Sequence, residues 1–542
     1  YTVDEQIYQK CPSIVVSTVD KFAQLPRQST GKIGQLFGAV GSYHQDTGFE
    51  RSSEPSTEFI SNFSAQRGLK PPNLIVQDEL HLIEGPLGSM VGFYETVIDK
   101  LMSEHPSLEN YKPKYVASSA TINRGEEQVQ CLFNRTTNLF PPKGITWKDR
   151  GFIVERDDEH PSSRGDEKGR LFLGICPIGQ SALAAQRDMF SSLLVHGYRA
   201  FDTTNNTASD RYWTLVGYYN SVRELAGART LLDFEVQQSI ERVIASRSLP
   251  SLTITRPDMG RIVELSGRME SSHLPLVLNN LETRRRGDDG ATDVLLSTSM
   301  FGTGVDVDRI NLMMVTGQPK STAQYIQAAG RVGRQNGGLI ITNLRNSRPR
   351  DLDHYERFVG YHAQINRYVE AVTIRPFAVP VLERAAGAVQ IAYLRNSRNV
   401  GLNPVGVEWW GRDGAHAFSP TTTLNADINA AMDLIVDRHN QQIVERQILD
   451  SPPNFIRSTL LEPKWDEWRA YCSNADAQNQ ELRWQRRDTR EQEGVPIRWS
   501  VMANEPQVED DQDKAVFSNE QQTPMSMRTT DGEIPVRTRG EN

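Results

Sequence analysis

The chain has 542 residues, a net charge of −8, 38% hydrophobic residues and 24% charged residues. This is the composition of a globular protein with two or three domains, and it excludes a collagen, a fibre and a wholly disordered chain. No apolar run is long enough to span a bilayer, and the four scattered cysteines favour neither a disulfide scaffold nor a zinc ribbon, so we expect a cytoplasmic protein without a membrane partner.

Short apolar runs alternate with helical patterns over the first 375 residues. This alternation predicts an α/β fold with parallel sheets. The predicted strands are Ser13–Val16, Asn73–Gln77, Tyr115–Ser118, Trp213–Tyr219, Ile262–Leu265, Val294–Ser297, Leu312–Val315 and Leu339–Thr342. The predicted helices between them are Ser89–Met102, Ser181–His196 and Ser221–Ser246.

Two polar segments and a change of pattern divide the chain. Ser42–Pro72 is polar and strand-poor, as in a surface insertion, and Asp157–Gly169 is a charged loop. After Arg375 the strands stop, and Val381–Arg395 and Ala426–Leu449 predict helices. The predicted parts are a first α/β domain at 1–156 with the insertion at 42–72, a second at 170–375, a helical accessory region at 376–503 and a flexible tail at 504–542.

One predicted strand ends in two adjacent carboxylates, within Asp78-Glu79-Leu80-His81. Asp78 is suited to hold Mg²⁺ through its water shell, and Glu79 to accept the proton of a water that attacks a phosphate. The cation would relieve the repulsion between the two carboxylates. The alternative is a solvated acidic turn, which the motif alone does not exclude.

The tripeptide Ser119-Ala120-Thr121 directly follows the strand predicted at 115–118. Small hydroxyl residues at a strand end can couple an acidic site to a neighbouring domain. The same residues are also ordinary turn chemistry, so this motif means little by itself.

A Gly-rich loop follows the strand that ends at Ser297. In this loop Thr298 could donate to a nucleic-acid phosphate, because hydroxyl side chains commonly contact phosphate oxygens. Gly304 allows close backbone approach, and Asp306 could accept from a ribose hydroxyl or orient an arginine. The alternative is an ordinary turn between a strand and a helix.

The most specific motif is Gln327-Ala328-Ala329-Gly330-Arg331-Val332-Gly333-Arg334. Its two arginines are three residues apart and lie on one face of a helical turn. Gly330 and Gly333 remove side-chain bulk, so that a phosphate chain could approach. Arginine forks donate to several phosphate oxygens and can stabilise charge on a transferred phosphoryl group. A merely basic surface helix is the weaker alternative.

Taken in chain order, these motifs resemble those of a superfamily-two helicase of the Asp-Glu-x-His type. The resemblance implies two RecA-like domains, the first incomplete here, with ATP and Mg²⁺ between them, nucleic acid across both, and a mainly helical C-terminal extension. His81 and Gln327 would face each other across the ATP cleft. The implied site residues are Asp78, Glu79, His81, Gln327, Arg331 and Arg334 for catalysis, Gly304, Asp306 and Gly330 for the nucleotide, and Ser119 and Thr121 for coupling.

Weaker matches to the same family supply candidate nucleic-acid contacts. Thr18 and Lys21 lie in a segment similar to the family's motif Ib, and Arg268 lies in one similar to the segment after motif IV; Thr298 joins them. The basic cluster at 284–286 is flanked by aspartates, which favours a solvated loop. The C-terminal tryptophans could stack on bases, but a core or interface role is favoured.

A helicase of this type needs a phosphate loop of the form Gly-x-x-x-x-Gly-Lys-Ser/Thr. Gly31-Lys32 does not fit, because Pro26 stands where the first glycine belongs and Ile33 follows the lysine. We therefore expect the loop upstream of residue 1, in a longer chain or in a separate N-terminal helicase fragment. This chain alone should have little or no ATPase activity, and turnover abolished by Lys32→Ala would contradict that expectation.

Further segments resemble the DrmA family of DISARM phage-defence helicases. They include Thr18–Arg27, Gln77–Gly88, Leu139–Pro142, His354–Phe358 with Tyr361-His362, and Pro524–Arg528. The resemblance implies an ATP hydrolase that works as a helicase or translocase on foreign or phage DNA, beside a DrmB-like partner with a DUF1998 domain. The alternative is a nucleic-acid-binding scaffold that organises defence partners without ATP turnover. The intact acidic pair and arginines argue against it, because a scaffold has no chemical need for them.

Overall fold

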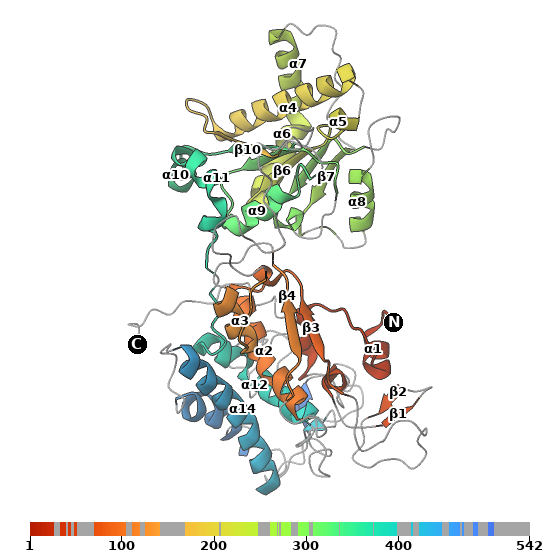
Figure 1. The fold of residues 1–542 in the computed structure, drawn as a ribbon, viewed down its shortest axis with the longest axis vertical. Coiled ribbons are helices and arrows are strands. Elements are labelled where there is room, and N and C mark those ends of the chain that lie inside the picture. The colour runs from red at the N-terminus through yellow and green to blue at the C-terminus, as the bar shows by residue number, and fades with distance from the viewer. Residues whose placement is uncertain are drawn as a thin grey trace. The chain divides into compact units, whose positions relative to one another are not determined.

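The computed structural model shows a chain that folds into two compact units (Figure 1). Unit 1 combines Tyr1–Ser119, Arg124–Phe140 and Val372–Asn542, and unit 2 combines Ala120–Asn123 with Pro141–Ala371. The described residues are 1–26, 33–38, 42–44, 48–50, 70–104, 111–119, 125–140, 169–204, 207–247, 261–267, 269, 273–282, 291–302, 307–334, 337–371, 373–397, 414–415, 422–446, 455–466, 469–470, 481–485 and 497–502.

Unit 2 is built on a parallel six-stranded sheet in the order β5-β10-β9-β6-β8-β7. The strands in the middle of the sheet are apolar along most of their length and buried on both faces, as expected for a parallel sheet covered by helices. The strands are β5 (Leu171–Ile175), β6 (Leu215–Tyr219), β7 (Ile262–Leu265), β8 (Val294–Ser297), β9 (Leu312–Thr316) and β10 (Leu339–Asn343).

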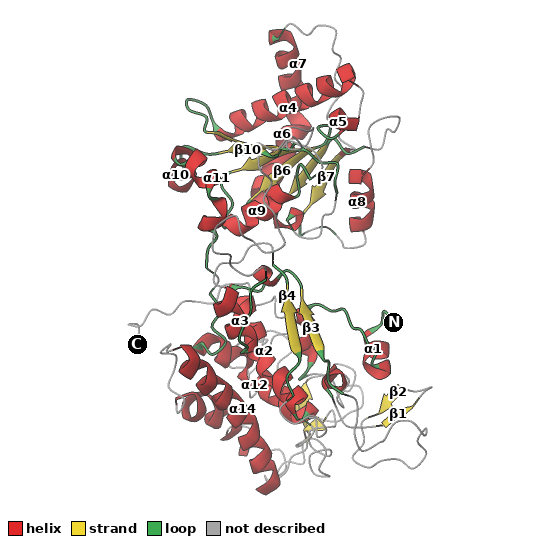
Figure 2. Ribbon diagram, viewed as in Figure 1, coloured by secondary structure: helices red, strands yellow, loops and turns green. Residues whose placement is uncertain are grey.

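Helices cover both faces of this sheet (Figure 2). On one face, α4 (Ala182–Thr204), α6 (Val222–Phe234) and α7 (Val236–Ser246) share a core with β6, β8 and β9. On the other face, α8 (Leu274–Glu282) and α9 (Thr322–Gly330) form the second core. The shorter helices of the unit are α5 (Thr207–Asp210), α10 (Pro349–Glu356) and α11 (Phe358–Ala363).

Unit 1 is organised around the helix α2 (Gly85–Ser103), which is buried along most of its length. It packs in one hydrophobic core with α3 (Gly125–Phe133), α12 (Val379–Asn396) and α14 (Thr422–Arg446). Trp465 is fully buried in this core, and its indole Nε1 donates to Gln390 Oε1 at 2.8 Å, so it is a core residue as favoured above. The helices after residue 371 therefore complete a core that begins near the start of the chain.

Two parallel strands, β3 (Leu74–Gln77) and β4 (Lys114–Ala117), lie against this helical core. The smaller elements are α1 (Asp4–Lys10), the antiparallel pair β1 (Ser42–His44) and β2 (Gly48–Glu50), and the sheet of β11 (Gly414–Ala415), β12 (Glu481–Gln485) and β13 (Ile497–Met502). Within the described ranges, no helix combines the length and the apolar character needed to cross a membrane.

The α/β fold class with parallel sheets is confirmed, and the predicted strands from Asn73 onward match β3, β4 and β6 to β10. The predicted strand Ser13–Val16 is wrong. This stretch has no regular secondary structure and pairs with no described strand, and Ile14 and Val16 are 82% and 92% exposed. A β-branched run favours extended backbone, but a strand also needs a neighbour, which local sequence does not supply.

Two further differences concern unit 2. The strand β5 was not predicted, because its five residues include Gly174, which weakens the strand pattern. The single helix predicted at Ser221–Ser246 is two helices, α6 and α7, that meet at Glu235. The domain limits drawn from the sequence stay predictions, and the flexible tail at 504–542 lies outside the described residues.

Candidate active site

The carboxyl ends of β3 and β4 bring the acidic pair and the hydroxyl residues together in unit 1. The parallel register places Gln77 beside Ala117, so Asp78 and Ser118 lead into adjacent loops. Ser118 Oγ donates to Asp78 Oδ1, which also accepts from the Glu79 backbone N–H at 3.0 Å. These two hydrogen bonds, the one from Ser118 first, lower the pKa of Asp78 below its usual value.

Glu79 and His81 occupy the turn that follows β3. The Glu79 backbone is left-handed, with φ 50° and ψ 48°, which is uncommon for a residue with a side chain and is found preferentially at functional sites. The His81 ring is buried, with Nδ1 3.2 Å from Ser119 Oγ and 3.4 Å from Glu79 Oε2. The structure thus gathers the acidic pair, His81 and Ser119 into one cluster.

Two residues that sequence analysis did not assign also hold this turn. Ser118, counted as the end of a strand, contacts Asp78 directly, and its carbonyl accepts from Leu80 N at 2.8 Å. The buried Gln128 on α3 donates through Nε2 to the carbonyls of Leu80 at 2.9 Å and Ile83 at 3.0 Å. No local pattern marks Gln128, because its partners are more than forty residues away in the chain.

The fit of Mg²⁺ to this cluster depends on Asp78. Among the described residues, no group of three or more His, Cys, Asp or Glu side chains is arranged to hold a metal ion. Mg²⁺ usually keeps several waters and binds through one or two carboxylates together with substrate phosphates. Asp78 is ionised, exposed and oriented by Ser118, which suits this kind of binding. A site in which protein side chains supply all the ligands of the ion does not fit these residues.

A second cluster lies in unit 2, around the turn that follows α9. Arg331 donates through Nε and Nη2 to the Gly302 carbonyl at 3.3 and 2.9 Å. Arg334 Nη1 lies 3.5 Å from Asp308 Oδ1. Gln327, on α9, lies beside Gly302, since a methyl group added there would be 3.6 Å from Gln327 Cβ. Gly302 belongs to the loop singled out in the sequence, but its contact with Arg331 was not predicted.

The two glycines of this motif differ in what they do. Gly333 has a φ of 67°, and a Cβ there would come within 2.5 Å of the Gly338 backbone N. It is therefore required by the path of the chain from α9 to β10, whatever binds nearby. Gly330 has open space around it, so the fold does not require a glycine there. The prediction that the absence of a side chain lets a phosphate chain approach therefore remains for Gly330 alone.

The other predicted site residues are more scattered. Thr18 is exposed at the start of a 3-10 turn at Val19–Gln24, and Lys21 pairs with Asp4 at 2.5 Å. Thr298, after β8, is only 9% exposed. His81 belongs to unit 1 and Gln327 to unit 2. Thr121, Arg268, Gly304 and Asp306 lie outside the described residues, as do Gly31-Lys32 and the basic cluster at 284–286.

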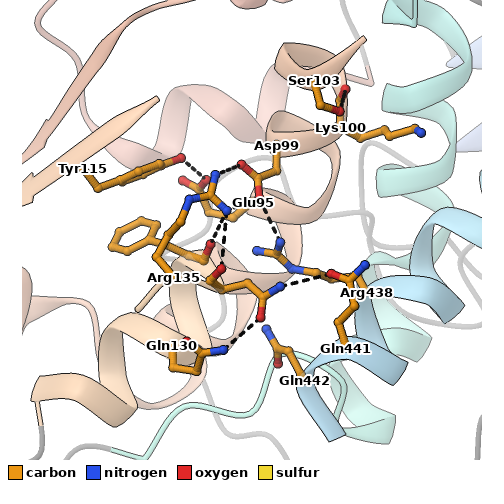
Figure 3. A network of polar contacts seen from close by, with 12 residues as sticks. Glu95, Asp99, Lys100, Ser103, Tyr115, Gln130, Arg135, Arg438, Gln441 and Gln442 are labelled. Atoms are coloured by element: carbon orange, nitrogen blue, oxygen red, sulfur yellow. Dashed lines mark hydrogen bonds and ion pairs between the residues drawn. The ribbon is translucent and has the colours of Figure 1, made fainter. Parts of the chain in front are cut away.

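A buried polar network joins α2 to α14 beneath β4 (Figure 3). Asp99 on α2 accepts from Arg135 Nη2 at 2.5 Å and from Arg438 Nη1, on α14, at 2.8 Å. Tyr115 on β4 donates its hydroxyl to Glu95 Oε2 at 3.0 Å. Burial, reinforced by the charge of Asp99, raises the pKa of Glu95 to about 8. The network thus supports the strand that ends at the acidic cluster.

Comparison with known proteins finds a helicase domain and helicase relatives. Residues 229–336, which include the arginine motif, match the family described as helicase conserved C-terminal domain. The DISARM protein DrmA of Bacillus paralicheniformis is 40% identical over 404 residues, which is 73% of this chain and 35% of that protein. The uncharacterized ATP-dependent helicase YprA of Bacillus subtilis is 35% identical over 309 residues, covering 56% of this chain and 33% of that protein.

Two solved structures are similar at low identity. The DUF1998 helicase MrfA bound to DNA has a TM-score of 0.40 and 20% identity, over 59% of this chain and 37% of that chain. The helicase Lhr of Mycobacterium smegmatis bound to ssDNA and AMP-PNP has a TM-score of 0.38 and 15% identity, over 68% and 37%. The chain spans about a third of the length of DrmA and of YprA. Over most of its length the chain is similar to the DISARM protein DrmA, and its residues 229–336 match the helicase conserved C-terminal domain.

Proposed function

We propose that this chain is part of an ATP-dependent DNA helicase or translocase that acts on foreign DNA in bacterial phage defence. The observation that supports ATP hydrolysis is the Ser118–Asp78 hydrogen bond, because it holds an ionised carboxylate next to Glu79 at the ends of two parallel strands. The similarity to DrmA supports the role in defence, with a DrmB-like DUF1998 protein as the expected partner and the bacterial cytoplasm as the location.

In the proposed mechanism, each described cluster has a separate task. Asp78 would hold Mg²⁺, which supplies charge neutralisation at the phosphates. Glu79 accepts the proton of the attacking water. Arg331 and Arg334 stabilise the charge that develops on the transferred phosphoryl group.

Other residues of the motifs couple hydrolysis to DNA. His81, Gln327, Ser119 and Thr121 couple the state of the nucleotide to the grip on DNA. Gly304, Asp306 and Gly330 border the nucleotide, and Thr18, Lys21, Arg268 and Thr298 contact the DNA backbone. We propose that the phosphate loop comes from polypeptide outside these 542 residues, so activity belongs to the longer helicase or its assembly.

The test is Glu79→Gln in the complete helicase. The substitution preserves size and removes the base, so ATP binding should persist while kcat falls on the order of 100-fold or more. Glu126→Gln, in the exposed first turn of α3, is the matched control and should hydrolyse ATP like the wild type. Equal hydrolysis by the wild type and Glu79→Gln would refute the role of Glu79. A complete wild-type helicase that binds DNA without hydrolysing ATP would instead favour the scaffold function.

A further inference from the structure

The helix α9 carries the arginine motif, and both of its ends are held by charged side chains that the helicase motifs do not include. The residues are Arg170, which directly precedes β5, and Glu370, which lies beyond α11. Both belong to unit 2, as α9 does. Neither is close to α9 in the sequence, so the fold brings each of them to one end of this helix.

At the C-terminal end, Arg170 bonds to the carbonyls that the last turn leaves without helical partners. Its Nη2 donates to the Gly330 carbonyl at 2.8 Å and its Nε to the Val332 carbonyl at 2.6 Å. A guanidinium at this position matches the partial negative charge of a helix C-terminus. Arg170 is itself fixed, because the next residue, Leu171, donates its N–H to the Gly338 carbonyl at 2.7 Å.

At the N-terminal end, Glu370 accepts the backbone N–H of Thr322 with both carboxylate oxygens at 2.9 Å. Its Oε1 also accepts from Thr322 Oγ1 at 3.1 Å. A carboxylate at a helix N-terminus satisfies backbone N–H groups and matches their positive charge. Ser321 adds an N-cap, with its Oγ accepting from Gln324 N at 3.2 Å.

Because α9 is held at both ends, the positions of Arg331 and Arg334 depend on these contacts. Arg331 is the first residue after α9. Arg170 donates to the carbonyls of the residues on either side of Arg331, which are Gly330 and Val332. Burial, and after it the charge of Arg334, lowers the pKa of Arg170. A displacement of this turn would therefore move Arg331 and Arg334 together.

We propose that Arg170 and Glu370 are positioning residues that hold α9 at its two ends, so that Arg331 and Arg334 are presented to the transferred phosphoryl group in one fixed geometry. This inference rests on the proposed ATP hydrolysis. Neither residue touches the nucleotide; both act through the arginines. Misplacing a catalytic group by a small distance costs a large part of the rate, so the effect should be on kcat rather than on nucleotide affinity.

The experiment compares Arg170→Gln, Arg170→Lys and Glu370→Ala in the complete helicase. Arg170→Gln and Glu370→Ala should lower kcat for ATP on the order of 10-fold or more, with the nucleotide Kd changed by less than about 3-fold. Arg170→Lys keeps the charge and one donor, and should recover part of the rate. Arg187→Gln removes an arginine that pairs with Asp188 and Glu235 away from α9, and should leave kcat unchanged.

A triple variant separates positioning from general stability. If Arg170 acts through the two arginines, then adding Arg170→Gln to a variant that carries both Arg331→Ala and Arg334→Ala should cost little further activity, because both residues that it positions are already gone. Equal fold-losses in both backgrounds, or wild-type kcat for both Arg170→Gln and Glu370→Ala, would overturn the inference. A wild-type helicase without ATPase activity would instead contradict the proposed function itself.

Discussion

Ser118 shows how a single hydroxyl can set the chemistry of the acidic site. Its hydrogen bond is the first cause of the lowered pKa of Asp78, ahead of the Glu79 backbone N–H. The sequence predicted Asp78, Glu79, His81 and Ser119 because adjacent carboxylates after an apolar strand are a recognisable pattern. It could not predict Ser118 or Gln128, since their roles depend on which strand pairs with β3 and on where α3 packs.

Ser118→Ala tests this role. Removing the hydroxyl should raise the pKa of Asp78, so that Asp78 becomes protonated, and loses its affinity for a cation, at a higher pH than in the wild type. The acidic limb of the pH profile of kcat/KM for ATP should therefore move to higher pH in the complete helicase. Ser119→Ala, which removes the contact with His81, serves as the comparison. Superimposable acidic limbs for Ser118→Ala and wild type would contradict the assignment.

At the scale of elements, the turn after α9 combines a requirement of the fold with one of function. The motif Gly330-Arg331-Val332-Gly333 was recognised from spacing alone, and α9 itself was not predicted as a helix with defined limits. The Arg331–Gly302 hydrogen bond connects two loops that are far apart in the sequence, so no periodicity in either loop reveals it. Long-range contacts of this kind are what sequence patterns omit.

The two glycines make a matched pair for an experiment on this turn. Gly333→Ala forces a Cβ into the Gly338 backbone at a positive φ, and should lower the free energy of unfolding by about 1–3 kcal/mol. Gly330→Ala has open space and should leave stability unchanged, or raise it by about 0.5 kcal/mol. Thermal unfolding of both variants measures the difference, and equal midpoints would show that the turn does not need a glycine at position 333.

At the scale of the whole molecule, the alternation of strands and helices was enough to predict the fold class, whereas the assembly of unit 1 was not predictable. The helices expected as an accessory region share one core with α2, and Arg438 on α14 binds Asp99 on α2 (Figure 3). An amphipathic pattern predicts that one face of a helix is buried against another element. Their partners are decided by tertiary contacts across more than three hundred residues of sequence.

The buried Glu95 in this network makes stability depend on pH. Its pKa is raised from 4.5 to about 8, so the folded state holds the proton more tightly than the unfolded state does. The stabilisation is complete below pH 4.5 and is lost as the pH rises through about 8. Urea unfolding across this interval should show a decline in wild-type stability that Glu95→Gln lacks, with Glu126→Gln as an exposed control that behaves like wild type. Parallel curves for wild type and Glu95→Gln would contradict this.

The return of the chain to unit 1 has a consequence for synthesis on the ribosome. Unit 2 is nearly continuous in sequence and can fold as soon as residue 371 has emerged, while the core of unit 1 still waits for α12, α14 and Trp465. Unit 1, which contains the acidic cluster, is therefore the first unit to be synthesised and the last to complete its core. During that interval the apolar surface of α2 is available to chaperones, and a premature stop codon after unit 2 would remove α12 and α14 and leave that surface uncovered.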